Sequence, residues 1–286
     1  MKKKLLGLYH FLLKWVPPAL LPAGLYVANR IKYFFTRRAY KLLLADWNSA
    51  KSIRKSDTAV IYATGPSLKL VNLDELKHFD SFSVSNFFLH EKLEIASPKI
   101  HFFAPFHEPL VYSDFIAWWK KADDTLPEST EICLSLDSFN MIKKEGLFLN
   151  RKVRFLDFSK AQYSRKPSPL KPILGPQSSP LMVLPVLLWM GYKRIILAGC
   201  DHNILKNYGG NVDNFYDNSR DIRSNATSGD NWRFGIIAHL DYQKNVFCQY
   251  HFYLKYAQAN NIELINISKE SWLDFIPYSD AKELGD

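Results

Sequence analysis

Short apolar runs recur along the chain and predict β-strands. The run Ala59–Ala63 consists of apolar, strand-favouring residues, and it ends at the turn sequence Thr64-Gly65-Pro66-Ser67. A run of this length bounded by turn residues is typical of a strand buried inside a sheet. The same pattern predicts six further strands, at Phe82–Asn86, Ile100–Ala104, Ile132–Leu136, Val153–Phe155, Arg194–Ala198 and Ile262–Ile265.

Longer helical patterns fill several of the gaps between these strands, most clearly at Pro180–Met190 and Leu240–Ala259. Alternation of strands and helices predicts an α/β protein with a mostly parallel, Rossmann-like sheet and helices on both of its faces. In such sheets ligands bind at the carboxyl ends of the strands. Residues 46–286 are therefore expected to form one domain with its site at that edge.

One long stretch, residues 201–235, has no regular pattern and is far longer than an ordinary connection. A loop of this length beside a strand end indicates a lid or a substrate-binding element. Asp213, Asp217 and Asp221 follow one another at intervals of four, which fits the solvated acidic face of a helix or a metal cluster. We favour the solvated face, because no neighbouring residues resemble a cage for a hard cation.

The N-terminal region, residues 1–45, is apolar, aromatic and basic. Residues 1–41 contain nine Lys or Arg and no Asp or Glu, whereas the whole chain carries a formal charge of +9. Lys14, Pro17, Pro18 and Pro22 interrupt the roughly 20 apolar residues that a membrane-spanning helix needs. We therefore expect an amphipathic helical arm on an anionic membrane surface, at the cytoplasmic face of the inner membrane; helices packed on the protein's own core, or a signal peptide, are the alternatives.

The remaining composition narrows the class of protein. At 286 residues with 47% hydrophobic residues, the chain can bury a large core. Outside the arm the formal charge is neutral, and a neutral body lacks the positive surface that nucleic-acid binding requires. Cys133, Cys200 and Cys248 are an odd number at wide spacing, which fits neither a disulfide framework nor a zinc site and indicates a reducing compartment.

Three loops contain residues that could bind a ligand or take part in catalysis. Thr64, Gly65, Pro66 and Ser67 follow the first strand, where a glycine allows a ligand to approach the backbone and hydroxyls can bind phosphate or ribose. Ser178 and Ser179 precede the helix at Pro180 and can cap it or bind an anion there. Gly199, Asp201 and His202 follow the sixth predicted strand. Each loop is also compatible with an ordinary turn or helix cap, and Asp201 with binding ribose, orienting a partner or holding a metal.

Three histidines deserve separate interpretations. His239 opens the last long helix, and because a helix N-terminus disfavours the imidazolium, its neutral ring can accept a proton. His251 shares a helical stripe with Phe247 and Leu254, so it is expected in the core. His107 follows the third strand, and its position favours neither a functional role nor a place in the core over the other.

Three motifs in this order resemble the bacterial sialyltransferases of glycosyltransferase family 42 and a related domain found in surface-polysaccharide loci. The motifs are Gly65-Pro66-Ser67-Leu68 after the first strand, Ser85-Asn86-Phe87-Phe88 after the second, and the segment from Met190 to Asp201. The resemblance covers roughly residues 58–268.

The resemblance implies a metal-independent transferase with a CMP-activated sugar as donor and no cofactor. It assigns donor binding to Thr64, Gly65, Ser67 and Asn86, small-hydroxyl contacts to Ser178 and Ser179, the catalytic base to His239, and assistance to the departing phosphate to Tyr208. The chain departs from the family at Thr64, where the family has Asn, at Pro180, where it has Gly, and at Asn203, which replaces the first of two tyrosines. Its basic arm is N-terminal, whereas the membrane-associating segment of the family is C-terminal.

The sequence and this resemblance thus predict an inverting glycosyltransferase that transfers a sialic acid-like or Kdo-like sugar to a lipopolysaccharide, capsule or lipid-linked glycan. A homo-oligomer is compatible with this function. A metal-dependent transferase of UDP- or GDP-sugars, an ATP-dependent pterin pyrophosphokinase and a noncatalytic component of a polysaccharide assembly complex are the alternatives. Nucleotide-induced stabilisation, with and without magnesium, distinguishes them.

Overall fold

The computed structural model describes residues 40–106, 110–160, 163, 166–223 and 232–284. The predicted arm lies outside these ranges apart from its last residues, as does His107. Residues from Leu44 onward belong to one compact unit. Among the described residues, no helix is both long enough and apolar enough to cross a bilayer.

Seven parallel strands form one sheet in the described part of the chain, as the short apolar runs predict. The strand bounds differ from the predicted ones by one or two residues at most ends, because strand ends are the least defined part of an apolar pattern. The strands are β1 (Thr58–Tyr62), β2 (Asp80–Val84), β3 (Ile100–Phe102), β4 (Glu131–Ser135), β5 (Val153–Leu156), β6 (Arg194–Ala198) and β7 (Glu263–Asn266).

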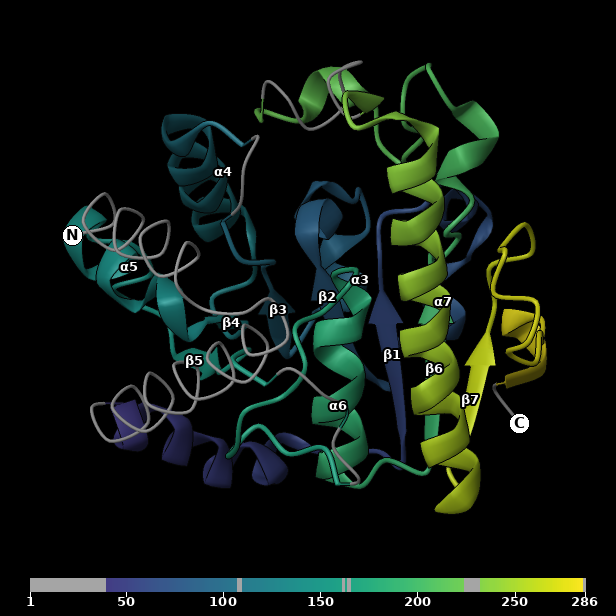
Figure 1. The fold of residues 1–286 in the computed structure, drawn as a ribbon. Coiled ribbons are helices and arrows are strands. Elements are labelled where there is room, and N and C mark those ends of the chain that lie inside the picture. Colours follow the sequence, from purple (N-terminus) through teal and green to yellow (C-terminus); the bar gives the residue numbers. More distant parts are fainter. Residues whose placement is uncertain (1–39, 107–109, 161–162, 164–165, 224–231, 285–286) are drawn as a thin grey trace, which may run out of the picture. The chain divides into compact units, whose positions relative to one another are not determined.

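The order of the strands in the sheet is β5-β4-β3-β2-β1-β6-β7. The chain first proceeds outward from β1 to β5 and then returns to the other side of β1 with β6 and β7 (Figure 1). All neighbours are parallel; Val60 on β1 lies opposite both Ser81 on β2 and Ile196 on β6. This is a Rossmann-like sheet whose direction of winding reverses between β1 and β6.

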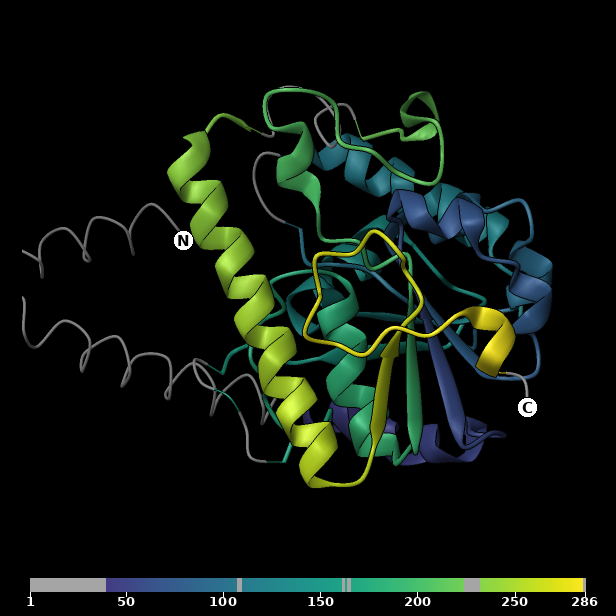
Figure 2. The same cartoon turned by 90° about the vertical axis from the view of Figure 1, so that its right-hand side faces the viewer.

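Two helices pack on one face of the sheet. The helix α6 (Pro180–Met190) is buried along almost its whole length and contacts β1, β2 and the helix α7 (Gly235–Ala259). A helix that is apolar on every side must be buried, and the position of α6 between the sheet and α7 satisfies that requirement. Figure 2 shows both helices on one side of the sheet and the blue segments between β1 and β3 on the other.

Shorter helices connect the first five strands. These are α3 (Leu93–Ala96), α4 (Tyr112–Thr125) and α5 (Phe139–Glu145), together with the 3₁₀ segments η3 (Pro66–Leu70), η4 (Leu73–Glu75), η5 (Ser85–Leu89) and η6 (Leu136–Ser138). In the described ranges the 3₁₀ segments η7 (Ile204–Asn207) and η8 (Asn218–Arg220) follow β6, and η10 (Ala281–Leu284) follows β7.

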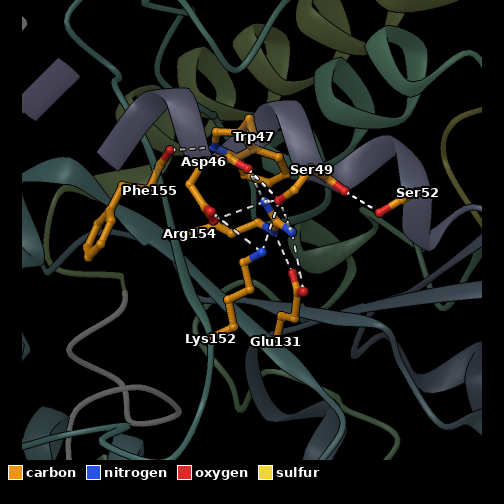
Figure 3. A network of polar contacts seen from close by, with 8 residues as sticks. All are labelled: Asp46, Trp47, Ser49, Ser52, Glu131, Lys152, Arg154 and Phe155. Carbon is orange, nitrogen blue, oxygen red and sulfur yellow. Dashed lines mark hydrogen bonds and ion pairs between the residues drawn. The ribbon is translucent and has the colours of Figure 1, made fainter. Parts of the chain in front are cut away.

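A buried cation joins the start of the compact unit to the sheet (Figure 3). Arg154 on β5 is completely buried and forms ion pairs with Glu131 on β4 and, at 3.1 Å, with Asp46 at the start of η2 (Asp46–Ile53). The indole of Trp47 donates to the carbonyl of Phe155 at 2.6 Å. Because a buried charge requires partners on every side, this network ties η2 to the outer strands of the sheet.

Candidate functional site at the β1–β6 switch point

The loops after β1 and β6 leave the sheet side by side at the point where the winding reverses. Tyr62 and Ala198 are paired in the sheet, so both strands end at the same level. Ligands of open α/β sheets bind outside the carboxyl ends of the strands at such a switch point. The fold therefore selects two of the three loops that the sequence singled out.

These two loops are in direct contact. The N–H of Gly65 donates to the carbonyl of Gly199 at 2.8 Å. A Cβ on Gly65 would lie 1.7 Å from the Oδ2 atom of Asp201, and Gly199 has a φ of +70°. Both glycines are needed here, Gly65 for the close approach and Gly199 for its backbone conformation.

Asp201 is the buried acid of this contact. Its Oδ2 accepts a hydrogen bond from the Ser67 hydroxyl at 2.9 Å, whereas its Oδ1 is buried and bonds to none of the residues that the structure describes. Burial raises the pKa of Asp201, and the hydrogen bonds from Ser67 partly oppose this rise. A buried carboxylate oxygen needs a partner, so a donor from a ligand, such as a ribose hydroxyl, would complete the site.

The segment after β7 holds the β6 loop in place. The Cys200 N–H donates to the hydroxyl of Ser268 at 3.0 Å, and the Ser271 hydroxyl donates to the Cys200 carbonyl at 2.8 Å. The Trp272 N–H donates to the Asp201 carbonyl, also at 2.8 Å. The sequence pattern did not identify these residues, because each contact joins positions about seventy residues apart.

His202 extends the site toward α7. Its φ is +49°, its Nε2 lies 2.9 Å from the hydroxyl of Tyr250, and its carbonyl accepts a hydrogen bond from Gln243 at 2.7 Å. Burial lowers the pKa of His202 to about 4, so its ring is neutral at physiological pH. His202 therefore connects the β6 loop to α7 as an uncharged hydrogen-bonding group.

The loop before α6 meets the same helix. The Oε1 of Gln249 accepts a hydrogen bond from the Gln177 N–H at 2.8 Å, and its Nε2 donates to the Gly175 carbonyl at 3.3 Å. Burial raises the pKa of Tyr250, and the neighbouring Ser178 hydroxyl opposes this effect. The helix α7 thus connects the loop before α6 to the β6 loop.

Ser179 occupies the N-cap position of α6, but its side chain forms no capping hydrogen bond. Pro180 follows as the first helical residue, where a missing N–H is tolerated.

His239 and Tyr208 lie together in an aromatic cluster. The ring of Trp232 is 5.0 Å from the ring of Tyr208 and 4.9 Å from the ring of His239, measured between centroids. The His239 Nε2 is buried and has no hydrogen-bond partner in the described ranges, whereas 43% of Tyr208 is exposed. His239 is one helical turn before Gln243, which places it at the end of α7 nearest the β6 loop.

The structure corrects two interpretations of α7. The helix begins at Gly235, so His239 lies in its second turn. The pattern missed the first turn because its apolar residues Ile236 and Ile237 are exposed and do not continue the buried stripe of the helix. His251 is exposed, since the buried face of the helix passes through its neighbour Tyr250.

The three regularly spaced acids do not form a helical face. Asp213 accepts a hydrogen bond from Asn207, Asp217 caps η8 through the Ser219 N–H, and Asp221 is buried against Arg223. Each acid has a separate local role because most of residues 211–223 is irregular. Within the described ranges, no group of three or more His, Cys, Asp or Glu could hold a metal ion.

Asn86 and Thr64 are hydrogen-bonded to residues 211–223, which we call the cover segment. The Thr64 carbonyl accepts a hydrogen bond from the Phe215 N–H at 3.1 Å. The Asn86 amide donates to Tyr216 and to Asp221, both at 2.7 Å, and accepts a hydrogen bond from the Trp118 indole. Both N–H donors of the Asn86 amide are therefore used within the protein, and a ligand can bind to them only by replacing Tyr216 or Asp221.

A buried histidine, which sequence reasoning did not single out, supports Asn86. The Nδ1 of His101 on β3 is 2.7 Å from the Ser83 hydroxyl, and its Nε2 is 2.9 Å from the Ser85 carbonyl. Ser85 has a φ of +54°, and burial lowers the pKa of His101 to about 3. This neutral ring fixes the unusual backbone that directs Asn86 inward.

Comparison with known proteins finds similarity among solved structures. No family model and no curated protein matches the chain. The sialyltransferase CST-II in complex with a trisaccharide acceptor and CMP is 17% identical, with a TM-score of 0.46 over 79% of this chain and 87% of that one. An apo α-2,3-sialyltransferase from Campylobacter jejuni is also 17% identical, with a TM-score of 0.42 over 79% and 81%. At this level of similarity, neither ligand nor activity transfers to the chain.

Proposed function

We propose that the chain is an inverting, metal-independent glycosyltransferase that takes a sialic acid-like or Kdo-like sugar from a CMP-activated donor. The observation that carries this proposal is the buried Asp201 at the switch point, with one oxygen bonded to Ser67 and the other without a partner among the described residues. The three sequence motifs that resemble family 42 support the class of donor. Two of them contribute a residue to this contact, the first motif Ser67 and the third motif Asp201.

In the proposed complex the nucleotide lies across the loops after β1 and β6. The backbone around Gly65 and the hydroxyl of Ser67 bind its polar groups, and Asp201 accepts a hydrogen bond from a ribose hydroxyl. Ser178, Ser179 and Tyr208 donate hydrogen bonds to the phosphate as it departs. Because a phosphate is a weakly basic leaving group, the reaction needs positioning and hydrogen bonds more than a strong acid.

His239 is the proposed catalytic base. Its Nε2 makes no hydrogen bond to the described residues, and the imidazole packs against the rings of Tyr208 and Trp232 in inclined, unstacked arrangements. An acceptor hydroxyl that approaches this nitrogen would lose its proton as it attacks the anomeric carbon. A single displacement of this kind inverts the configuration at that carbon.

The acceptor that we propose is a lipopolysaccharide, capsule or lipid-linked glycan. The basic, aromatic sequence of residues 1–41 supports this choice, because such an arm would keep the enzyme on an anionic bilayer at the cytoplasmic face of the inner membrane.

Melting temperatures measured with CMP, UDP, GDP and ATP, each with and without magnesium, test the proposed function. We expect CMP alone to stabilise the protein, by about 2.7 kcal/mol at a concentration 100 times its Kd, and magnesium to add nothing. Stabilisation by UDP or GDP only with magnesium would contradict the proposal and indicate a metal-dependent transferase, and ATP with magnesium a pyrophosphokinase. Absence of any nucleotide effect would indicate a noncatalytic protein.

A further inference from the structure

A buried carboxylate occupies a set of hydrogen-bond donors beside the proposed donor site. The side chain of Asp221 is completely buried, and its Oδ2 accepts from the Asn86 amide at 2.7 Å, from the Tyr216 hydroxyl at 3.3 Å and from the Arg223 guanidinium at 2.7 Å. Its Oδ1 accepts from the Nε and the backbone N–H of Arg223 at 2.9 and 3.0 Å. We call Asn86, Tyr216 and Arg223 the carboxylate cradle.

The cradle favours a charged occupant. Burial raises the pKa of Asp221, but the ion pair with Arg223 and the bond from Asn86 outweigh this effect, and the pKa is lowered. Arg223 carries a fixed positive charge and is 14% exposed, so an anion must balance it. Two parallel donors on a guanidinium match the two oxygens of a carboxylate.

The cradle donors are held by contacts that do not involve Asp221. The indole N–H of Trp118 on α4 donates to the amide oxygen of Asn86, and the Trp118 ring lies 4.1 Å from the Arg223 guanidinium. One buried tryptophan therefore positions both the amide and the cation. Donors fixed in this way remain arranged when a different carboxylate replaces that of Asp221.

The proposed donor sugars contain the group that this cradle fits. Sialic acid-like and Kdo-like sugars are keto-acid sugars, whose anomeric carbon bears a carboxylate next to the bond that breaks. Asn86 belongs to the second sequence motif, and the cover segment reaches from the β1 loop at Thr64 to Asn86. The cradle thus adjoins the loops that are proposed to bind the nucleotide.

We propose that Asn86, Tyr216 and Arg223 bind the carboxylate of the donor sugar, and that Asp221 occupies their cradle until the donor displaces it. This inference rests on the proposed function for the identity of the ligand. It makes Arg223 the residue that selects keto-acid sugars over neutral hexoses. It also makes Asp221 an internal competitor that bonds the cover segment to Asn86 until the donor sugar binds.

Small carboxylates test the cradle without any nucleotide. Asp221→Ala leaves the cradle donors without an anion, so its melting temperature is expected to fall by several degrees. Sodium acetate should recover most of that loss, in a saturable manner, whereas sodium chloride at equal ionic strength should not. Asp217→Ala on the same segment is the control, because Asp217 is exposed and only caps η8. Equal effects of acetate on both variants would overturn the proposal.

Binding of donor analogues tests the occupant. We expect the wild-type protein to bind an unreactive CMP–keto-acid sugar at least roughly tenfold more tightly than its carboxyl methyl ester, the usual range for a charged hydrogen bond. Arg223→Gln should lose this preference but keep its affinity for CMP, and Asp221→Asn should bind the acid more tightly than wild type does. An unchanged acid-to-ester ratio in Arg223→Gln would overturn the cradle and leave the proposed function intact. Acetate rescue in a protein that CMP does not stabilise would instead refute the nucleotide-sugar function.

Discussion

Replacement of His239 by alanine is expected to lower kcat for sugar transfer by roughly 100- to 10,000-fold, the contribution typical of a positioned general base. The affinity for CMP should change little, because the imidazole acts on the acceptor hydroxyl and not on the nucleotide. The measurement is steady-state transfer from the CMP-sugar donor, together with the melting temperature with and without CMP.

His251→Ala provides a control on the same helix. His251 is exposed, and its ring packs against the ring of Phe275 in a T-shaped arrangement, with 5.6 Å between centroids. This variant should retain nearly all activity. If His239→Ala were to fold, bind CMP and still turn over at a rate close to wild type, His239 would not be the base.

Asp201→Asn is expected to separate stability from binding. The amide can still accept the Ser67 hydrogen bonds, but it no longer offers a carboxylate oxygen to the ligand. CMP affinity should therefore fall by roughly 10- to 100-fold, as expected for the loss of a charged hydrogen bond. The stabilisation by CMP in a thermal melt should shrink accordingly.

The same variant should be at least as stable as wild type at neutral pH. Burial raises the pKa of Asp201 in the folded state above its ordinary value of 3.8. Ionisation of this group therefore destabilises the folded state as the pH rises from that ordinary value through the raised one, and an amide avoids this penalty. The difference in melting temperature between the two proteins should diminish as the pH is lowered toward 4.

Asp157→Asn is the matched control for this experiment. Asp157 is also a buried acid that follows a strand, β5, and its Oδ2 has no partner among the residues that the structure describes. Because β5 lies at the edge of the sheet, away from the switch point, this variant should keep the wild-type affinity for CMP. Equal loss of affinity in both variants would show that Asp201 has no specific role.

The sequence predicted the sheet well because each strand is buried on both faces. Such strands are short, uniformly apolar runs, and the turn at Thr64 and Gly65 marks the end of the first one. The start of α7 was not predictable by the same reasoning, since the exposed Ile236 and Ile237 break the expected pattern of buried and exposed positions. The assignment of His251 to the core failed for a related reason: a shift of one residue around a helix is enough to move a side chain from the interior to the surface.

The candidate loops were also visible in the sequence, as hydroxyl, glycine and acidic residues after predicted strands. The sequence did not show which residues these loops contact in the folded protein. The acid at position 221 looked like part of a regular acidic series, and only the fold brings it to Asn86, 135 residues away in the sequence. Tyr250 and Gln249 gave no signal either, because their role depends on which loops α7 faces.

A crystal structure of the protein with CMP tests the central claim most directly. The account predicts a nucleotide across the carboxyl ends of β1 and β6, with the Oδ1 of Asp201 within hydrogen-bonding distance of a ribose hydroxyl and Ser67 beside the nucleotide. CMP bound elsewhere on the protein, with the contact between Ser67 and Asp201 undisturbed and no ligand near it, would contradict the account.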